Sequence, residues 1–371
     1  MAVTGTRGKS SVTRLVASGL RASGARVLAK TTGSKPVLIF PDGSEREVSR
    51  AGPASIREQV RLVSLTGRTG ADVLVSEMMS IGPECLAVES RRILRPTILA
   101  LTNVRLDHLA EMGWRKDDVA HTLASAFPPQ ADIFIPEEEV YPVFEEAAAR
   151  AGSRLHPVAP PAGPPILASG LGADPIPPFE EFEPNVRLAL AILDSMGVKR
   201  EEALRGMALA GPDLGSFKIW SGRFGDPLRP AVCISAFAAN EPQSSAAALE
   251  MVRDKVPLAS RPLLGILSLR EDRGDRTLQW VRAAADGFFR GFAHVVLVGP
   301  PAGPALRKFR RSAGPGGPAF SRCLGSSPAA VMNHVFSVAP DEPVVVGLGN
   351  IVGPGERVIR YWEERGEPDD R

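Results

Sequence analysis

The stretch from Val3 to Val12 constrains this chain more than any other part of its sequence. It reads VTGTRGKSSV: a short apolar start, two glycines three residues apart, then a lysine and two serines. An amphipathic run with apolar Leu15, Val16 and Leu20 follows. This order predicts a strand, a glycine loop and a helix. Backbone N–H groups in such a loop, at the start of a helix, bind phosphate.

The polar residues of the loop suit a nucleoside triphosphate. We expect Lys9 to reach the β- and γ-phosphates and the Ser10 hydroxyl to hold Mg²⁺. The strict eight-residue pattern needs a glycine where Val3 stands, so the match is to the shorter form G-T-x-G-K-[ST]-[ST]. A tight strand–helix turn with a chance Gly-Lys-Ser is the alternative. The residues predicted to bind the nucleotide are Gly5, Thr6, Arg7, Gly8, Lys9, Ser10 and Ser11.

Composition excludes several other classes of protein. A net charge of +2 over 371 residues does not favour nucleic-acid binding. The three cysteines are widely scattered, which suits a reducing cytoplasm and argues against a cysteine-based zinc site. No run approaches the roughly 18 consecutive apolar residues of a membrane-spanning helix.

The alternation of short apolar runs with longer amphipathic ones predicts an α/β fold in two domains. Residues 1–222 form a P-loop ATP-binding domain with a central, mostly parallel sheet, and residues 223–371 form a smaller Rossmann-like domain. Expected strands of the first are 26–30, 37–40 paired with 47–48, 72–76, 95–102 and 132–135; expected helices are 55–65, 116–127, 137–150 and 184–196. Residues 157–178 are predicted to be a surface loop.

The second block is predicted to repeat the alternation. Its expected strands are 231–237, 263–267, 294–298 and 343–346, and its expected helices are 244–255, 278–289, 329–338 and 356–364, with a short basic helix inside 299–317.

Polar groups follow two predicted strands of the first domain. Glu77 ends one strand, and Asp107-His108 follow the next. Ligands of open α/β sheets bind beyond the carboxyl ends of the strands, so these groups face the edge that carries the glycine loop. Mg²⁺ takes oxygen ligands, which Ser10 and Glu77 supply, and His108 is a candidate third ligand. An ordinary loop carboxylate and a hydrogen-bonded core histidine are the alternatives.

Two stretches of the second domain also carry polar groups after predicted strands. In 269–277, LREDRGDRT, we assign Asp272 and Arg273 to a charged substrate, because arginine binds carboxylate and phosphate bidentately; a solvated loop is the alternative. The stretch 347–353 reads G-x-G-x-x-x-G, one residue longer than the dinucleotide fingerprint, and no βαβ unit can follow it. We therefore exclude NAD; an anion site and a tight turn remain open. Since no nucleophile–base pair occurs, the chemistry is expected to proceed through ATP.

Taken together, these motifs resemble the Mur ligase superfamily, and within it the ligase subunit of poly-γ-glutamate synthases. The similar stretches are 5–13, 30–33, 76–80, 103–108 with 112–113, 184–190, 237–240, 270–277 and 347–353. They run in the family's order from the first residues to near the last. The glycine loop is only superfamily-specific, whereas 237–240, 270–277 and 347–353 select the polyglutamate branch.

The resemblance implies further site residues. It assigns Asn185 to the nucleotide base and Lys218 to phosphate contact. It gives Lys9, His108, Lys218 and Arg273 catalytic roles. The substrate would contact Thr32, Asn240, Asp272, Arg273 and Asn350.

The resemblance also implies an activity: ATP-dependent, ADP-forming extension of poly-γ-glutamate with Mg²⁺. A terminal carboxylate becomes an acyl phosphate, which the amine of the next glutamate attacks. Implied partners are the polymer, membrane subunits of a synthase complex and a homo-oligomer. The protein would be cytoplasmic, at the inner face of the membrane through partners or an N-terminal anchor. The alternatives are another Mur-type ligase, such as a folylpolyglutamate synthase, and a P-loop ATPase that serves assembly without ligase activity.

Overall fold

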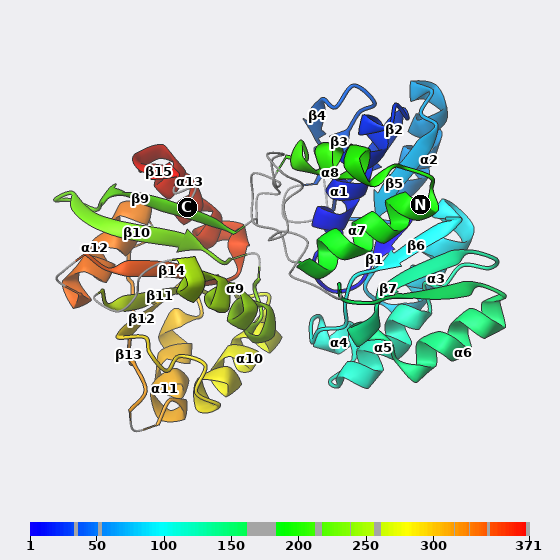
Figure 1. Ribbon diagram of the computed structural model, residues 1–371. Helices are drawn as coiled ribbons and strands as arrows, with labels where there is room; N and C mark the ends of the chain where they lie inside the picture. The colour runs from blue at the N-terminus through cyan, green and yellow to red at the C-terminus, as the bar shows by residue number, and fades with distance from the viewer. Residues whose placement is uncertain are drawn as a thin grey trace. The chain divides into compact units, whose positions relative to one another are not determined.

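A computed structural model describes the chain except at residues 33–35, 51–53, 162–182, 212–216, 238, 256–260, 315, 326, 340–341 and 369–371. The chain divides into two units, Met1–Asp213 and Leu214–Arg371 (Figure 1). Each unit is an α/β layer structure, so the predicted fold class is confirmed. The division falls before the expected 222/223 boundary because strand β9 (Lys218–Phe224) pairs into the second sheet.

The first unit is built on an eight-stranded sheet of order β4-β3-β2-β5-β1-β6-β7-β8. Six strands are parallel, and β3 and β4 form an antiparallel hairpin at one edge. The central strand β1 has only three residues. The strands are β1 (Ala2–Thr4), β2 (Val27–Lys30), β3 (Val37–Ile39), β4 (Glu45–Glu47), β5 (Val73–Glu77), β6 (Ile98–Leu101), β7 (Asp132–Pro136) and β8 (Arg154–Val158).

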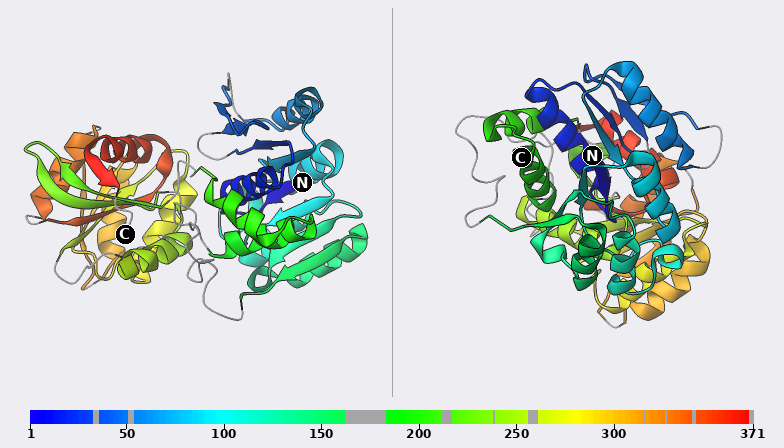
Figure 2. Two further views of the ribbon diagram at one scale, coloured as in Figure 1. Left: turned by 45° about the horizontal axis from the view of Figure 1, so that its top comes forward. Right: turned by 90° about the vertical axis from the view of Figure 1, so that its right-hand side faces the viewer.

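Helices cover both faces of this sheet (Figure 2). Side chains alternate along β6: Leu99 and Leu101 pack with one apolar cluster and Ala100 with the other. Helices α1 (Lys9–Ala22), α7 (Glu183–Ser195) and α8 (Arg200–Ala208) bury their apolar faces in one cluster. Helices α3 (Pro83–Val88), α5 (Lys116–Ala124) and α6 (Pro142–Ala151) contribute to the other. The remaining helices are α2 (Arg57–Thr69), η1 (Glu89–Leu94), α4 (Leu109–Met112) and η2 (Glu137–Glu139).

The structure departs from the sequence expectations in a few segments. The helix expected over 137–150 is a short 3₁₀ turn, η2, followed by α6. Pro142 occupies the first turn of α6, where its missing N–H costs nothing, so it starts a helix rather than continuing one. Strand β8 and helices α3, η1 and α8 were not predicted. Of the expected loop 157–178, the first residues end β8 and residues 162–178 lie outside the described part.

The second unit is built on a seven-stranded sheet of order β13-β12-β11-β14-β10-β9-β15. Five strands are parallel, and β9 and β15 are antiparallel at one edge. Its further strands are β10 (Arg229–Ser235), β11 (Leu263–Ser268), β12 (His294–Val298), β13 (Ala319–Arg322), β14 (Val344–Gly349) and β15 (Gly366–Pro368). Its helices are α9 (Pro242–Lys255), α10 (Gly274–Ala285), α11 (Ala302–Ser312), α12 (Pro328–Val338), η4 (Ile351–Gly355) and α13 (Glu356–Arg365).

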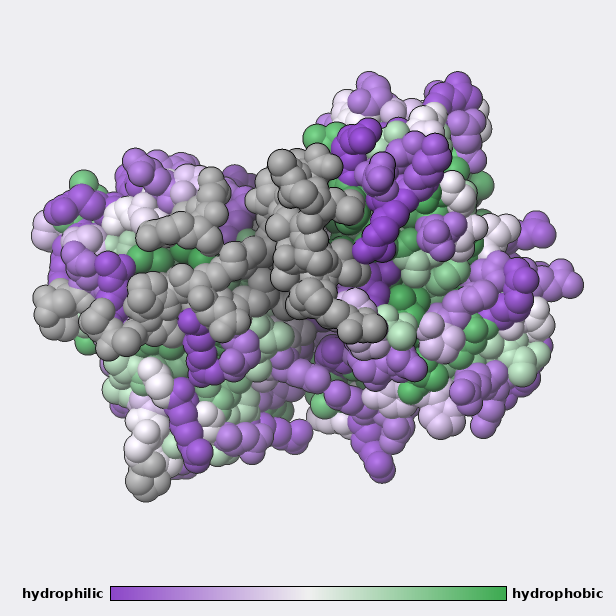
Figure 3. Space-filling model, in the orientation of Figure 1, coloured by the Kyte–Doolittle hydropathy of each residue, from purple (hydrophilic) through white to green (hydrophobic). Residues whose placement is uncertain are grey.

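Helix α10 begins at Gly274, four residues before the expected start at 278. Asp275 and Arg276 are therefore in its first turn rather than in a loop, and Arg276 is buried. On the surface, the face of the first unit seen in Figure 3 is largely hydrophilic. Within the described residues, no helix combines the length and apolarity that crossing a bilayer requires.

Candidate active site

The glycine loop between β1 and α1 adopts a backbone conformation that depends on its two glycines. Gly5 has φ 116°, and a Cβ there would lie 2.2 Å from Thr102 Oγ1. Gly8 has φ 76°, and a Cβ there would lie 2.5 Å from Asn185 Oδ1. Both positions thus need a positive φ and a close approach that only glycine allows. The contact also places the Asn185 amide, predicted to bind the nucleotide, directly over the loop.

The loop is held from the neighbouring strand end by Asn103. The Asn103 Oδ1 atom accepts hydrogen bonds from the Thr6 hydroxyl (2.8 Å) and the Arg7 N–H (3.0 Å). Its Nδ2 donates to the Arg7 carbonyl at 3.1 Å, and the Thr102 hydroxyl donates to the same carbonyl at 2.6 Å. Asn103 belongs to a stretch that carries the family resemblance, but no role was predicted for it. The structure identifies it as the residue that fixes the loop.

Lys9 folds back over the loop that it follows. Its ammonium group donates to the Gly5 carbonyl at 2.9 Å and to the Thr6 carbonyl at 3.3 Å. Burial lowers the pKa of Lys9 below its ordinary value of 10.5, and the nearby Glu77 carboxylate opposes that shift. The positive charge is therefore held where a phosphate would bind and is incompletely neutralised by the protein.

Ser10, Glu77 and Thr32 meet at the same edge of the sheet. The Ser10 hydroxyl donates to Glu77 Oε2 at 2.7 Å, and the Thr32 backbone N–H donates to the same oxygen at 2.7 Å. The Glu77 side chain is buried, 3% exposed. A hydroxyl and a carboxylate from different strand ends are the hard oxygen donors that Mg²⁺ prefers, so the residues fit this ion.

Two buried residues that the sequence analysis missed support Glu77 from behind. Gln59 Nε2 donates to the Glu77 carbonyl at 2.9 Å and to Glu89 Oε1 at 2.7 Å. The Glu89 carboxylate also accepts from the N–H groups of Met79 (2.9 Å) and Ser80 (2.8 Å). Both Gln59 and Glu89 are fully buried. They come from α2 and η1, and nothing in the sequence distinguishes them from surface helix residues.

Asp107 and His108 join the glycine loop through an ion pair. The Arg7 guanidinium lies 2.9 Å from Asp107 Oδ2. His108 adopts a left-handed conformation, φ 46°, with its N–H donating to Asp107 Oδ1 at 2.9 Å. Its Nε2 lies 3.8 Å from Asp107 Oδ2. Among the described residues, no group of three or more His, Cys, Asp or Glu side chains could hold a metal. His108 stays a predicted metal ligand.

The five site residues predicted in the second unit lie at the carboxyl edge of its parallel strands. Asn240 follows β10, Asp272 and Arg273 follow β11, and Asn350 follows β14. Lys218 begins the antiparallel strand β9, paired with Ser235 at the end of β10, so it belongs to this edge as well.

Their side chains are engaged in separate contacts. Asn350 Oδ1 accepts from Arg276 Nη1 at 2.7 Å, and its Nδ2 donates to the Ser268 carbonyl at 3.2 Å. Asp272 pairs with Arg270 at 2.5 Å, Arg273 with Asp275 at 3.4 Å, and Lys218 with Glu363 at 2.9 Å. For Asn240 the contact is through the main chain: its backbone carbonyl accepts from Trp280 Nε1 at 3.3 Å. Arg276, which the sequence analysis did not select, is thus the arginine buried at this edge.

Two serine hydroxyls at the same edge are unsatisfied. Ser235 ends β10 and Ser268 ends β11, on either side of β14. Both are buried, and neither hydroxyl has a hydrogen-bond partner among the described residues. Buried polar groups normally have hydrogen-bond partners. Two buried hydroxyls without one, at the ends of neighbouring strands, are typical of a place where a ligand or water supplies the partner.

Comparisons with known proteins match both units. Residues 3–153 match the family model of the Mur ligase middle domain, and residues 223–365 match that of the poly-gamma-glutamate synthase CapB C-terminal domain. The chain is 28% identical to the capsule biosynthesis protein CapB of Bacillus anthracis, over 96% of this chain and 75% of that protein. It is 26% identical to PGA synthase CapB of Bacillus subtilis, over 98% of this chain and 89% of that protein.

Solved structures share the fold. A folylpolyglutamate synthase from Mycobacterium tuberculosis, complexed with ADP and AMPPCP, has a TM-score of 0.66 at 18% identity, covering 100% of this chain and 91% of that one. MurF from Acinetobacter baumannii has a TM-score of 0.64 at 16% identity, covering 97% of this chain and 76% of that one.

Proposed function

We propose that this chain extends poly-γ-glutamate as a member of the CapB family within the Mur ligase superfamily. It is an ATP-dependent amide ligase. In the proposed reaction, a terminal carboxylate oxygen of the polymer attacks the γ-phosphorus of ATP and ADP leaves. The amine of the incoming glutamate then attacks the acyl carbon, loses a proton and expels phosphate. The observation that carries the proposal is the buried Ser10–Glu77 pair beside the Lys9 loop.

Such a reaction requires positioning and charge neutralisation rather than a protein nucleophile. The backbone of residues 5–11 would bind the ATP phosphates, and Asn185 the base. Lys9 would neutralise charge on the transferring phosphoryl group, as preorganised cations do in other phosphoryl-transfer sites. Ser10, Glu77 and His108 would hold Mg²⁺, which would add positive charge against the phosphates.

In the second unit, Lys218 would contact phosphate, and Asp272 with Arg273 would bind the glutamate substrate. Asn240 and Asn350 are further substrate residues, as is Thr32 in the first unit. The unsatisfied hydroxyls of Ser235 and Ser268 support a polar ligand at the second edge.

The test is a reaction with purified protein, ATP, Mg²⁺, glutamate and a poly-γ-glutamate primer. ADP, phosphate and product mass are measured together, and carboxylate labelled with ¹⁸O should transfer one label to the released phosphate. Glu77→Gln should raise the Mg²⁺ concentration needed for half-maximal rate. ATP hydrolysis without a new amide bond, or without label transfer, would instead identify a P-loop ATPase.

A folylpolyglutamate synthase shares the fold, so folate must be tested as an acceptor. The match over 223–365 to the CapB domain favours the polymer. A chain that adds glutamate to a folate but not to poly-γ-glutamate would reverse this choice.

We further propose that the protein works with membrane subunits of a polyglutamate synthase at the inner face of the membrane. Its CapB relatives are named for capsule and PGA synthesis, which supports such a system. Co-sedimentation of the protein with membranes only when those subunits are expressed is the expected result.

A further inference from the structure

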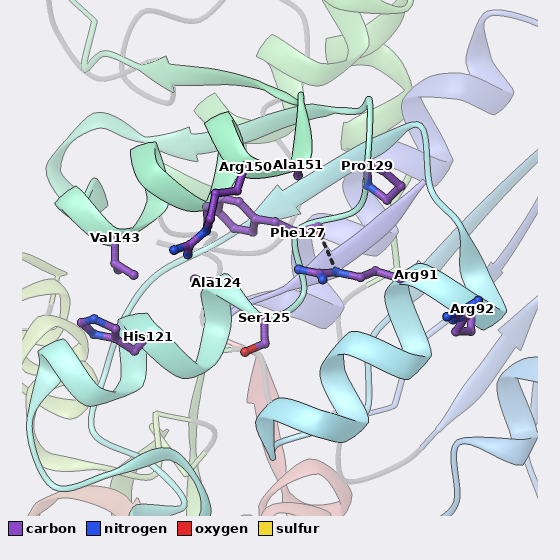
Figure 4. Close-up of a pocket in the computed structure, with 11 residues that line it drawn as sticks. Arg91, Arg92, His121, Ala124, Ser125, Phe127, Pro129, Val143, Arg150 and Ala151 are labelled. Carbon is purple, nitrogen blue, oxygen red and sulfur yellow. Dashed lines mark hydrogen bonds between the residues drawn. The ribbon is translucent and has the colours of Figure 1, made fainter.

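A second candidate binding site lies in the first unit, in a groove between η1, α5 and α6. Its volume is about 710 Å³. Its charged lining residues are all basic: Arg91 and Arg92 from η1, and Arg150 from the end of α6. Figure 4 shows Arg150 beside the ring of Phe127, and Arg91 pointing from η1 toward the middle of the groove. The groove thus combines three guanidinium groups with an apolar lining.

The groove lies at the opposite edge of the sheet from the glycine loop. Helix η1 precedes β6, the segment after α5 precedes β7, and the end of α6 precedes β8, so Pro129 and Arg150 lie toward the amino ends of these strands, while Val143 in the first turn of α6 extends the groove along the helices. Lys9, Glu77 and Asn103 all follow the carboxyl ends of strands. Because the two edges are separated by the length of the strands, the groove is not part of the ATP site.

Within the described part of the chain, the guanidinium groups in the groove have no carboxylate partners. Arg92 and Arg150 are exposed, and within the described residues neither forms an ion pair with an acidic side chain. Arg91 is also exposed and donates from Nε to the Phe127 carbonyl at 2.9 Å. Like-charged side chains that line one groove repel one another, and a bound polyanion would relieve that repulsion.

We propose that this groove binds the already polymerised part of a poly-γ-glutamate chain. The inference rests on the proposed function. Each γ-linked residue carries one α-carboxylate and a CH₂–CH₂ segment in the chain itself. The carboxylates complement the guanidinium groups, which bind such groups bidentately. The methylene segments complement the accessible apolar lining formed by Pro129, Val143 and Ala151.

The location predicts a dependence on polymer length. Strand β7 has five residues, so its two ends are separated by about 13 Å at 3.3 Å per residue. A γ-linked residue has five backbone bonds instead of three and spans about 6 Å when extended, by scaling the usual reach of a residue. A chain of two residues cannot occupy both sites, whereas one of ten can. A chain held at both sites gains effective concentration at the reacting end.

The experiment compares two double variants that each remove two exposed positive charges. R92Q/R150Q alters the groove, and R57Q/R61Q alters the solvent-exposed surface of α2. Binding of a fluorescent ten-residue poly-γ-glutamate to the whole protein is measured by anisotropy, at low and high salt. Ligation kinetics are measured with two-residue and ten-residue acceptors. Circular dichroism confirms that both variants are folded.

We expect R92Q/R150Q to weaken binding of the ten-residue chain by about three- to tenfold, as the loss of two exposed carboxylate contacts allows. The ratio of KM for the long acceptor to KM for the short one should rise by a similar factor, and the R57Q/R61Q protein should match the wild type. Equal affinity for the polymer in the wild type and both variants would overturn the inference. That result is also the one expected if the groove binds an acidic protein instead of the polymer. A different result would contradict the proposed function: wild-type protein that forms no amide bond with either acceptor. The ratio of the two KM values does not by itself test that function.

Discussion

At the carboxyl edge of each sheet an asparagine forms hydrogen bonds to nearby groups, but the groups that it binds differ between the two sheets. In each, an asparagine follows a parallel strand: the half-buried Asn103 after β6 and the buried Asn350 after β14. Asn103 binds the adjacent glycine loop through Thr6 and Arg7. Asn350 binds the Ser268 carbonyl and the Arg276 guanidinium. The same side chain thus holds a phosphate loop open at one edge and fixes an arginine at the other.

One glycine of the second edge has a different role from the two glycines of the first loop. Gly5 and Gly8 give the first loop its positive φ values and its close contacts. In the second unit, a Cβ on Gly347 would lie 2.1 Å from the ring of Phe237, inside the apolar core. Gly347 is therefore a packing residue. A glycine-rich strand end therefore indicates a phosphate site only where the glycines shape the loop after the strand, and not where they make room for an aromatic ring in the core.

The largest effect should come from removing the cation of the first edge. Lys9→Ala should lower kcat for ATP-dependent ligation by about 10²–10³, the loss typical of removing one preorganised charge-stabilising group. Lys308→Ala, which removes an exposed lysine of α11, is the control and should keep wild-type kcat. Full activity in the Lys9→Ala protein would remove the glycine loop from the mechanism.

The second effect tests whether Gly347 only packs. Gly347→Ala should destabilise the second unit by about 3 kcal/mol, because the new methyl group overlaps Phe237. Gly274→Ala is the matched control, since no atom lies within 4 Å of its added Cβ. Urea unfolding gives the free energies. If Gly347→Ala is as stable as the control but loses substrate binding, the glycine serves a ligand site.

A third, smaller effect separates the two asparagines. Asn103→Ala should weaken ATP binding by about tenfold, since its lost hydrogen bonds are worth roughly 1–2 kcal/mol. Asn350→Ala should instead lower the free energy of unfolding by about the same amount and raise KM for glutamate. Calorimetric titration with ATP and urea unfolding measure the two quantities. The distinction fails if both variants lose nucleotide affinity equally.

The fourth prediction concerns alkaline pH at the first edge. In the proposed mechanism ATP binds the ammonium form of Lys9, whose pKa is lowered by burial. As the pH rises, this ammonium group loses its proton below pH 10.5, so the affinity for ATP should fall at alkaline pH. Lys9→Ala should abolish this pH dependence. An unchanged alkaline profile in that variant would assign the titration to another residue.

The smallest effect is expected at acidic pH in the second unit. His294 and His334 share the Ser321 hydroxyl, at 2.8 and 2.7 Å, and burial lowers the pKa of both histidines below 6.5. The unfolded chain then binds more protons than the folded one, so stability should fall as pH drops through 6.5 and below. Urea unfolding at pH 5 and pH 7 measures it. His334→Asn should reduce the difference; an increase would contradict this account.

The parts of the molecule that sequence predicts well are those with a local signal. The β1–α1 loop is predictable because Gly5, Gly8 and Lys9 lie close together in the sequence and each suits a phosphate-binding loop for a distinct chemical reason. Gln59 and Glu89 were not predictable, because burial of a helical glutamine and glutamate depends on which helices pack behind β5. Arg276 was missed for a related reason: the start of α10 at Gly274 turns a charged stretch into a helix with a buried side.

The hydrogen bonds between Asn103 and the glycine loop have a consequence for protein engineering. A fragment cut out as residues 2–22 would contain the glycine loop. It would lack the Asn103 side chain, the Thr102 hydroxyl and the Asp107 carboxylate that hold this loop. The smallest transplantable module is therefore discontinuous: β1 with α1, together with β6 and the segment that follows it. Design methods that graft contiguous loops onto new scaffolds would miss half of this one.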